Sequence, residues 1–252
     1  MFGETPMPDR PEIRLSVVIP AFNEETRLPA TLLSVRSYLS VQPYRWEVLV
    51  VNDGSRDRTA ESVLREAPDA GPIRLIEHPD RANHGKGAAV RLGMLRAGGA
   101  YRLFMDADNS TTVDQVDRFW PWFDRGWDVV IGSRNLPGSE IPVRQPWYKE
   151  LAGRAGNLLI RALAAPGIAD TQAGFKMFTA RSAGTIFSKT TIDRWGFDFE
   201  VLAIAKAHGL QVREVPIRWI NSPASKVRLA SYLEVLGEVW RVRRNIRRDA
   251  YR

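Results

Sequence analysis

Two carboxylates one residue apart, Asp106 and Asp108, directly follow the apolar run Tyr101–Met105. In an extended chain, side chains at i and i+2 point to the same side, about 6.5–7 Å apart along the backbone. Paired oxygen ligands at a strand end suit Mg²⁺, which takes one or two protein carboxylates and completes its shell with water and phosphate oxygens. The pair therefore favours a site for a nucleotide sugar. A strand-to-loop turn is the alternative, because Asn109 and Ser110 continue the segment in turn-forming residues.

The bulk composition excludes several kinds of chemistry. The chain has 252 residues, a formal net charge of +7 and no cysteine, which excludes disulfides, thiolate catalysis and cysteine-based zinc sites. No apolar stretch approaches the roughly 18–20 residues that span a bilayer. Residues 1–12 are polar and proline-rich, without a hydrophobic signal segment. We interpret them as a flexible leader on a cytosolic protein.

Short apolar runs alternate with amphipathic helical patterns in the first half of the chain. This order predicts an α/β fold with a mostly parallel sheet and helices on both faces. We expect residues 13–225 to form one domain, because no internal repeat or clear boundary interrupts them. The expected strands are Leu15–Pro20, Trp46–Asn52, Ile73–Glu77, Tyr101–Met105 and Val129–Ile131, and the expected helices are Glu25–Leu39, Asp57–Ala67, Gly87–Ala97 and Val113–Phe123.

The second half is less regular. Polar motifs at Asp170–Lys176 and Arg194–Asp198 separate its elements. The expected elements are a loop at Leu136–Pro146, helices at Trp147–Ala165 and Phe199–His208, a strand near Val212–Ile217, and a final helix after Lys226.

Two motifs follow the first two expected strands. Pro20-Ala21-Phe22-Asn23-Glu24 closes the first strand, where backbone amides and the Asn and Glu side chains could hydrogen-bond a base and a ribose. Asp53 and Gly54 follow the second strand. There Asp53 could accept hydrogen bonds from a uracil or ribose, and Gly54 would permit close approach of the ligand. Capping of the next helix is the alternative at both places.

Two basic residues could neutralise phosphate. Asn83-His84-Gly85-Lys86-Gly87 precedes an expected helix, so its glycines free backbone amides for an anion and Lys86 adds a point charge. Arg134 follows the fifth strand and could fork onto a phosphate or carboxylate. An ordinary surface cation is the alternative for each.

Two later residues, Gln172 and Asp198, lie in motifs that contain aromatic residues, one in the first motif and three in the second. Asp198 sits in Arg194-Trp195-Gly196-Phe197-Asp198-Phe199-Glu200. An acid in an aromatic-walled loop is unusual unless it is paired or functional, because desolvating a carboxylate is costly. N-capping of the following helix is the alternative for Asp198.

The segment 226–252 is basic and amphipathic. Leu229, Leu233, Leu236 and Trp240 recur at helical spacing, and arginines cluster at the end of the segment. An apolar face with a basic flank suits a helix lying on an anionic bilayer. A helix packed on the catalytic core with solvated arginines is the alternative. No recognised nucleic-acid motif accompanies the charge, so we do not expect a nucleic-acid partner.

Together these motifs resemble family 2 inverting glycosyltransferases of the GT-A fold, a Rossmann-like sheet flanked by helices. The resemblance runs from about Leu15 to Val227. Within that family the chain is similar to the polyprenyl- and dolichyl-phosphate sugar synthases. The dolichyl-phosphate β-glucosyltransferases are the most similar group and the dolichol-phosphate mannose synthases a near relative. The segments that carry this likeness are Asp106-Ala107-Asp108, Asp170–Lys176 and Trp195–Glu200.

The resemblance implies roles for the residues singled out above. Asp106 and Asp108, with Ala107 between them, would hold the diphosphate through Mg²⁺ or Mn²⁺. One departure concerns the metal: the mannose synthases carry a glutamine ligand where this chain has Ser110. The other implied site residues are Pro20, Ala21, Phe22, Glu24, Asp53 and Gly54 for the nucleoside, Lys86 and Arg134 for phosphates, and Gln172 and Asp198 for the sugar and acceptor.

The implied reaction is transfer of a hexose from a nucleotide sugar to a polyprenyl or dolichyl phosphate, with inversion. UDP-glucose is the expected donor and GDP-mannose the alternative. We expect a cytoplasmic protein in peripheral contact with the inner face of an anionic membrane. A soluble family 2 transferase with a hydroxyl acceptor is a further alternative.

Overall fold

The computed structural model describes residues 12–67, 71–143, 147–221 and 229–252. Most of the expected leader, the end of the expected loop at 136–146, and Lys226 lie outside these residues. In the described part, no helix is long and apolar enough to cross a membrane.

The centre of the molecule is a seven-stranded sheet with the order β3-β2-β1-β4-β6-β5-β7. Only β6 runs antiparallel to its neighbours, β4 and β5, and the other strand pairs are parallel. This confirms the predicted mostly parallel α/β sheet. The strands are β1 (Leu15–Ala21), β2 (Trp46–Asn52), β3 (Ile73–Glu77), β4 (Tyr101–Met105), β5 (Val129–Ser133), β6 (Phe175–Thr179) and β7 (Val212–Pro216).

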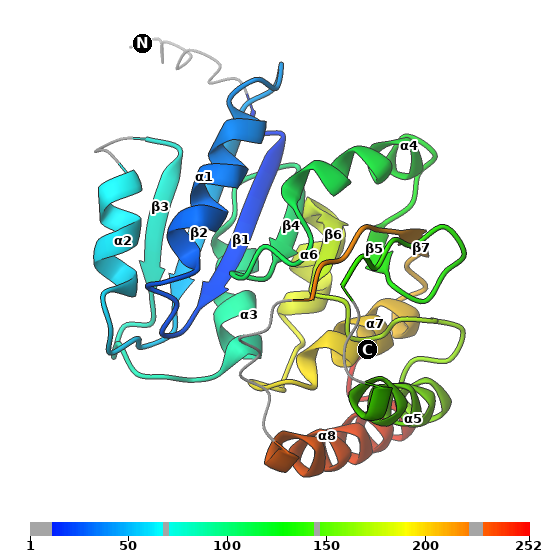
Figure 1. Cartoon of the computed structure of the whole chain (residues 1–252). Coiled ribbons are helices and arrows are strands. Elements are labelled where there is room, and N and C mark those ends of the chain that lie inside the picture. Colours follow the sequence, from blue (N-terminus) through cyan, green and yellow to red (C-terminus); the bar gives the residue numbers. More distant parts are fainter. Residues whose placement is uncertain (1–11, 68–70, 144–146, 222–228) are drawn as a thin grey trace, which may run out of the picture.

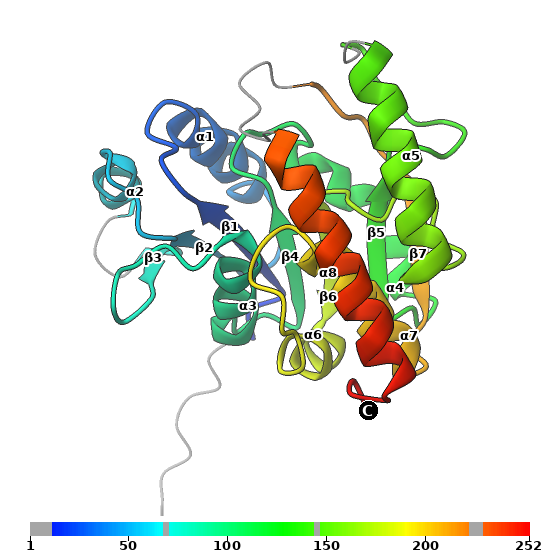
Figure 2. The same cartoon turned by 90° about the horizontal axis from the view of Figure 1, so that it is seen from below.

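Helices cover both faces of the sheet (Figures 1 and 2). α1 and α2 lie on one face, and α3, α6 and α7 lie on the other. α5 and α8 pack side by side outside α7, farther from the sheet. The helices are α1 (Leu28–Leu39), α2 (Thr59–Glu66), α3 (Lys86–Arg96), the 3₁₀ turn η1 (Val113–Arg118), α4 (Trp120–Phe123), α5 (Trp147–Leu163), α6 (Ala180–Phe187), α7 (Phe197–Ala207) and α8 (Leu229–Arg247).

Apolar side chains that point alternately to the two faces of the strands form a core on each side of the sheet. Val17 and Leu103 pack with α1 on one side, whereas Val18 and Phe104 pack with α3 and α7 on the other. Consecutive strand residues point to opposite faces, and helices cover both, so the strands read as continuous apolar runs. The two cores fix the strands in place, and the polar motifs lie at the carboxyl ends of the parallel strands.

The structure corrects several expected boundaries. Pro29 stands at the start of α1, so this helix begins at Leu28, three residues later than expected. The helix expected over Val113–Phe123 is a 3₁₀ turn followed by a short α-helix, since Pro121 removes a backbone donor and interrupts a continuous helix. α7 begins at Phe197 rather than Phe199.

β6 and α6 were not predicted from the sequence. Lys176 interrupts the apolar run of β6, yet its side chain is fully buried. A buried lysine requires a charged partner, and none is adjacent in the sequence. The partner supplied by the fold is described below.

Candidate active site

A cavity of about 2080 Å³ opens at the carboxyl ends of the parallel strands. The loops after β1, β2, β4 and β5 all reach it. Because β6 runs antiparallel to β4, the segment 170–174 that precedes it arrives at the same edge. Every predicted site residue except Gly54 lines the cavity: Pro20, Ala21, Phe22, Glu24, Asp53, Lys86, Asp106, Ala107, Asp108, Arg134, Gln172 and Asp198.

The Asp53 carboxylate, 2% exposed, fixes the loop that leads into α3. It accepts hydrogen bonds from Asn83 Nδ2 at 2.9 Å and from the backbone N–H groups of His84 and Gly85, each at 2.8 Å. A carboxylate offers about four acceptor positions, so three protein donors leave about one for a ligand. Asp53 therefore positions Lys86 through this loop as well as facing the cavity.

The structure explains the glycine at position 54 differently from the sequence-based expectation. Its φ is +68°, and an added Cβ would lie 2.6 Å from the backbone of Ala82 and Asn83. The glycine thus admits the neighbouring loop, not a ligand.

Arg27 joins the site although no motif in the sequence pointed to it. Its Nε lies 2.6 Å from the Glu24 carboxylate, and its Nη1 lies 3.8 Å from Asp108 Oδ2. The hydrogen bond with Glu24 outweighs burial and raises the pKa of the Arg27 guanidinium. The only sequence signal was its position three residues after Glu24.

Ala107 and Asp108 form a turn directly after β4, as in the strand-to-loop alternative, so Asp106 and Asp108 are not held in one extended segment. Both nevertheless line the cavity, with 37% and 23% of their side chains exposed. Asp108 Oδ1 accepts the Ser110 N–H at 3.0 Å. The two carboxylates present hard oxygen donors to one space, which fits Mg²⁺ or Mn²⁺ if phosphate and water complete the shell. Among the described residues, no group of three or more His, Cys, Asp or Glu is arranged to hold a metal.

Asp106, Lys86, Asp198 and Lys176 form a row of alternating charges. Lys86 Nζ lies 2.7 Å from Asp106 Oδ1 and 4.0 Å from Asp198 Oδ2. Lys176 Nζ lies 2.5 Å from Asp198 Oδ1 and donates to the Ala173 carbonyl at 2.6 Å. Burial opposes the charge of Lys86, but Asp106 and Asp198 together raise its pKa well above the ordinary value. For Lys176 the effect of burial prevails and lowers its pKa.

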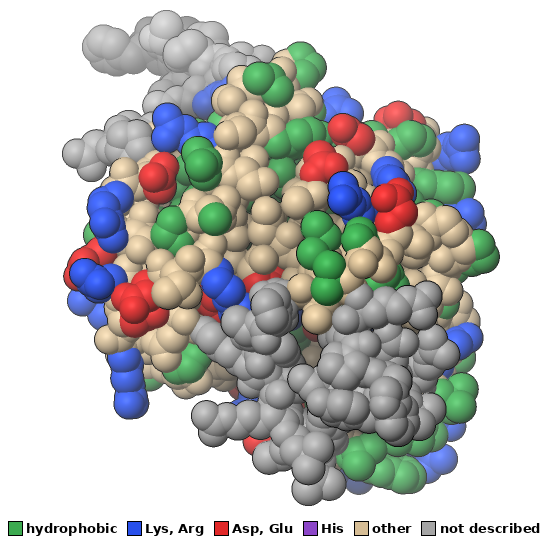
Figure 3. Space-filling view, viewed as in Figure 1, with side chains coloured by type: hydrophobic (Ala, Val, Ile, Leu, Met, Phe, Trp, Pro, Cys, Tyr) green, Lys and Arg blue, Asp and Glu red, His purple; other side chains and the backbone are tan. Residues whose placement is uncertain are grey.

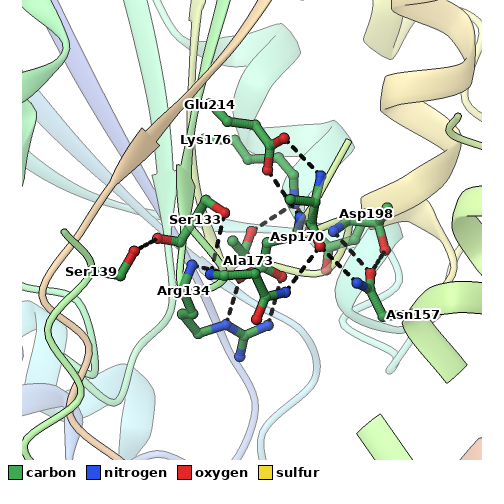
Figure 4. A network of polar contacts seen from close by, with 12 residues as sticks. Ser133, Arg134, Ser139, Asn157, Asp170, Ala173, Lys176, Asp198 and Glu214 are labelled. Atoms are coloured by element: carbon green, nitrogen blue, oxygen red, sulfur yellow. Dashed lines mark hydrogen bonds and ion pairs between the residues drawn. The ribbon is translucent and has the colours of Figure 1, made fainter. Parts of the chain in front are cut away.

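Asp198 is thus the partner that the buried Lys176 requires (Figure 4). Asp198 lies in the first turn of α7, whose N-cap is Gly196, and no side chain caps that helix. The capping alternative for Asp198 is therefore wrong.

Arg134 forks onto Asp170 (Figure 4). Its Nε and Nη2 lie 2.7 and 2.8 Å from the two carboxylate oxygens, and its backbone N–H donates at 2.9 Å. Burial opposes both charges, but the pairing raises the pKa of Arg134 and lowers that of Asp170. Of the two partners expected for this fork, a phosphate or a carboxylate, the structure shows a carboxylate of the protein itself. The guanidinium carbon of Arg134, Cζ, lies over the Trp219 ring, 5.4 Å from the ring centroid.

Side chains from α5 and α8 complete the cavity, and no motif in the sequence predicted that they line it. Asn157 of α5 donates to the Ala169 carbonyl at 2.7 Å and accepts from Thr171 Oγ1 at 2.8 Å, which fixes the loop that carries Gln172. Asparagine is disfavoured inside helices unless it makes such a bond, and this was the one available signal. Glu234, Val235, Leu236 and Val239 line the cavity from α8.

Gly174 allows Asp106 its position, because an added Cβ would overlap the Asp106 carboxylate. We expect Gly174→Ala to displace Asp106 and to slow any reaction in this cavity about 100-fold, as ångström-scale misplacement of a site group does. Gly184→Ala is the matched control, since a Cβ there meets nothing within 4 Å. The control should keep full activity and gain about 0.5–1 kcal/mol of stability. Initial rates and thermal unfolding of both variants check this, and equal rates would contradict it.

Comparisons with known proteins agree with this geometry. Residues 16–187 match the Glycosyl transferase family 2 model. The chain is 33% identical to dolichyl-phosphate beta-glucosyltransferase ALG5D of Trichomonas vaginalis, over 93% of this chain and 74% of the relative. It is 35% identical to the dolichyl-phosphate beta-glucosyltransferase of Drosophila melanogaster, over 87% of this chain and 71% of the relative.

A solved structure shares the GT-A fold. Glucosyl-3-phosphoglycerate synthase from Mycobacterium tuberculosis, in complex with Mn²⁺, UDP and glucosyl-3-phosphoglycerate, superposes with a TM-score of 0.61 at 18% identity. The superposition covers 94% of this chain and 80% of that one.

Proposed function

Because the chain belongs to glycosyl transferase family 2 and is a glycosyltransferase, we propose that it transfers glucose from UDP-glucose to a polyprenyl or dolichyl phosphate. The observation that carries the proposal is the identity of 33% and 35% to two dolichyl-phosphate beta-glucosyltransferases along most of this chain. The cavity supports it, because carboxylates and cations meet there at the ends of the parallel strands, where such sheets bind nucleotides.

The donor lies with its nucleoside against Pro20–Glu24 and Asp53. Asp106 and Asp108 would hold Mg²⁺ or Mn²⁺, and a bound cation supplies charge neutralisation for the departing diphosphate. Lys86 reaches the same place from the start of α3. The fold neighbour with Mn²⁺ and UDP in its complex is consistent with this arrangement.

The acceptor contributes its own nucleophile. A phosphate oxygen attacks the anomeric carbon, the bond from that carbon to the diphosphate oxygen breaks on the opposite face, and the nucleoside diphosphate leaves. A phosphate monoester is already largely ionised near neutral pH, so no protein base has to remove a proton. Positioning of the two substrates then carries most of the rate enhancement.

The pairing of the acids supports an ionised acceptor. Within the described residues, Asp106, Asp170 and Asp198 each have a cation within 2.8 Å. A carboxylate whose oxygens already accept from an ammonium or guanidinium has fewer lone pairs left to take a proton from an acceptor. Such a cavity suits an acceptor that needs no deprotonation.

α8 would place the cavity next to the membrane. The helix packs on the core through Val239 and Val242, each 0% exposed, and Tyr251 beyond it donates to the buried Glu200 at 2.8 Å. Leu236 and Trp240, one helical turn apart, remain 39% and 61% exposed. Figure 3 shows hydrophobic and basic side chains at the surface on the lower right, where Figure 1 places α5 and α8. We propose peripheral attachment to the anionic inner face of a membrane from the cytoplasm.

Replacing both Leu236 and Trp240 with serine should weaken binding to anionic vesicles by tenfold or more. Burial of one large apolar side chain contributes about 1.5–3 kcal/mol, so loss of two removes most of the apolar attachment. Leu64→Ser is the control, because Leu64 is 59% exposed on α2, away from α8. Vesicle flotation of the three proteins measures the difference, and unchanged flotation of the double variant would refute attachment through this face.

The reaction is tested by incubating the protein with radiolabelled nucleotide sugars, Mg²⁺ and polyprenyl phosphate. We expect label from UDP-glucose in the lipid extract, with less or none from GDP-mannose. A parallel arm offers a water-soluble hydroxyl acceptor. Label only in that arm would overturn the phosphate acceptor, and preference for GDP-mannose would overturn the donor.

A further inference from the structure

We propose that Lys86 is the resident counter-cation of Asp106. A divalent cation that binds Asp106 Oδ1 must displace the Lys86 ammonium, and an incoming nucleoside diphosphate then binds the displaced ammonium. The inference rests on the proposed function only in taking a nucleoside diphosphate as the ligand. It makes Lys86 the residue that couples metal binding to nucleotide binding.

The geometry places Lys86 directly on a metal-ligand oxygen. Its Nζ is 2.7 Å from Asp106 Oδ1, and Mg²⁺ would need that oxygen at about 2.0–2.1 Å. The two cations cannot share one oxygen at these distances without strong repulsion. Metal binding through Asp106 Oδ1 therefore requires Lys86 to move.

Asp198 alone is a poor destination for the displaced ammonium. Its Oδ2 is 4.0 Å from Lys86 Nζ, but its Oδ1 is already held by Lys176 at 2.5 Å. One carboxylate cannot fully compensate two buried ammonium groups. Asp108, the other carboxylate that acts on Lys86, would be engaged by the same metal. Without a further anion from a ligand, Asp106 therefore remains the favoured partner of Lys86.

The surroundings of Lys86 allow its ammonium group to move a short distance but keep it within the cavity. The Nζ lies 5.8 and 5.6 Å from the ring centroids of Trp195 and Phe197, and only 20% of the side chain is exposed. The flexible stem of a lysine lets the charge shift within this aromatic wall. A diphosphate beside Asp106 would offer the nearest additional anion. Metal and nucleotide then bind with positive coupling, and each raises the affinity for the other by the same factor.

Removing the ammonium should therefore change metal binding in the absence of nucleotide. We expect Lys86→Met to bind Mn²⁺ about tenfold more tightly than the wild type without UDP, within the usual range of coupling between sites. Addition of UDP should then raise the Mn²⁺ affinity of the variant by a smaller factor than it does for the wild type. Titration of free Mn²⁺ by electron paramagnetic resonance, with and without UDP, measures all four affinities.

Two variants control for charge and for folding. Arg194→Met removes a cation from the cavity wall that pairs with Glu234 at 3.6 Å, and it should change Mn²⁺ affinity less than about twofold. Lys86→Gln, of similar length, replaces Lys86→Met if thermal unfolding shows that the methionine variant does not fold.

The outcomes separate clearly. Equal or weaker Mn²⁺ binding by the folded Lys86 variant, an equal gain in Arg194→Met, or no Mn²⁺ binding by any form would overturn the inference. Tighter Mn²⁺ binding by the Lys86 variant without any binding of UDP would support displacement of Lys86 while contradicting the proposed nucleotide.

Discussion

Replacing Asp106 with asparagine should lower kcat/KM for the nucleotide sugar by about 1,000-fold or more. The substitution keeps the size of the side chain but removes a charge that would hold the metal, and stabilisation of a leaving group by a metal is worth several kcal/mol. It also removes the negative charge that lies 2.7 Å from the Lys86 ammonium. Asp108→Asn should cause a comparable loss, because Mg²⁺ uses so few protein ligands. Initial rates at several concentrations of nucleotide sugar and metal measure both effects.

Asp124→Asn is the matched control, because Asp124 is exposed and does not line the cavity. Its rate should equal that of the wild type. Thermal unfolding of all three variants distinguishes loss of chemistry from loss of fold. An Asp106→Asn variant that folds and keeps more than a tenth of the activity would place the diphosphate elsewhere in the cavity.

The residues that the sequence located well share one property, which is a position directly after a strand. Asp53, Asp106 and Arg134 each follow a run that the apolar pattern defines, and parallel strands bring such ends to one edge. Knowledge of the strand order was not needed to predict that these residues meet. The local pattern and the topology of parallel sheets were sufficient.

Which charge pairs with which could not be predicted in the same way. Arg134 was expected to meet a phosphate or a carboxylate, and the carboxylate that it holds, Asp170, lies 36 positions along the chain. β6 was missed because Lys176 interrupts its apolar pattern, and the partner that allows this lysine to be buried, Asp198, lies 22 positions along the chain in α7. Such pairs depend on the antiparallel course of β6, which no local signal specifies.

Removal of one partner from the buried ion pair of Lys176 and Asp198 should strongly reduce the stability of the fold. Lys176→Met should destabilise the protein by about 3–5 kcal/mol, because it leaves Asp198 buried, at 5% side-chain exposure, without its close cation. For a chain of this size, the melting temperature should fall by roughly 10 °C. Lys206→Met, at an exposed lysine of α7, should change stability by less than about 0.5 kcal/mol. Denaturant unfolding of both variants is the measurement.

Asp198→Asn should be milder, because the amide oxygen can still accept a hydrogen bond from Lys176 and burial already lowers the pKa of that lysine. If Asp198 acts only as the partner of Lys176 and Lys86, the variant should keep a substantial part of the activity on polyprenyl phosphate. An enzyme that used this carboxylate to deprotonate a hydroxyl would lose nearly all of it. Complete loss in Asp198→Asn, with intact binding of both substrates and an unchanged melting temperature, would therefore favour a hydroxyl acceptor over a phosphate.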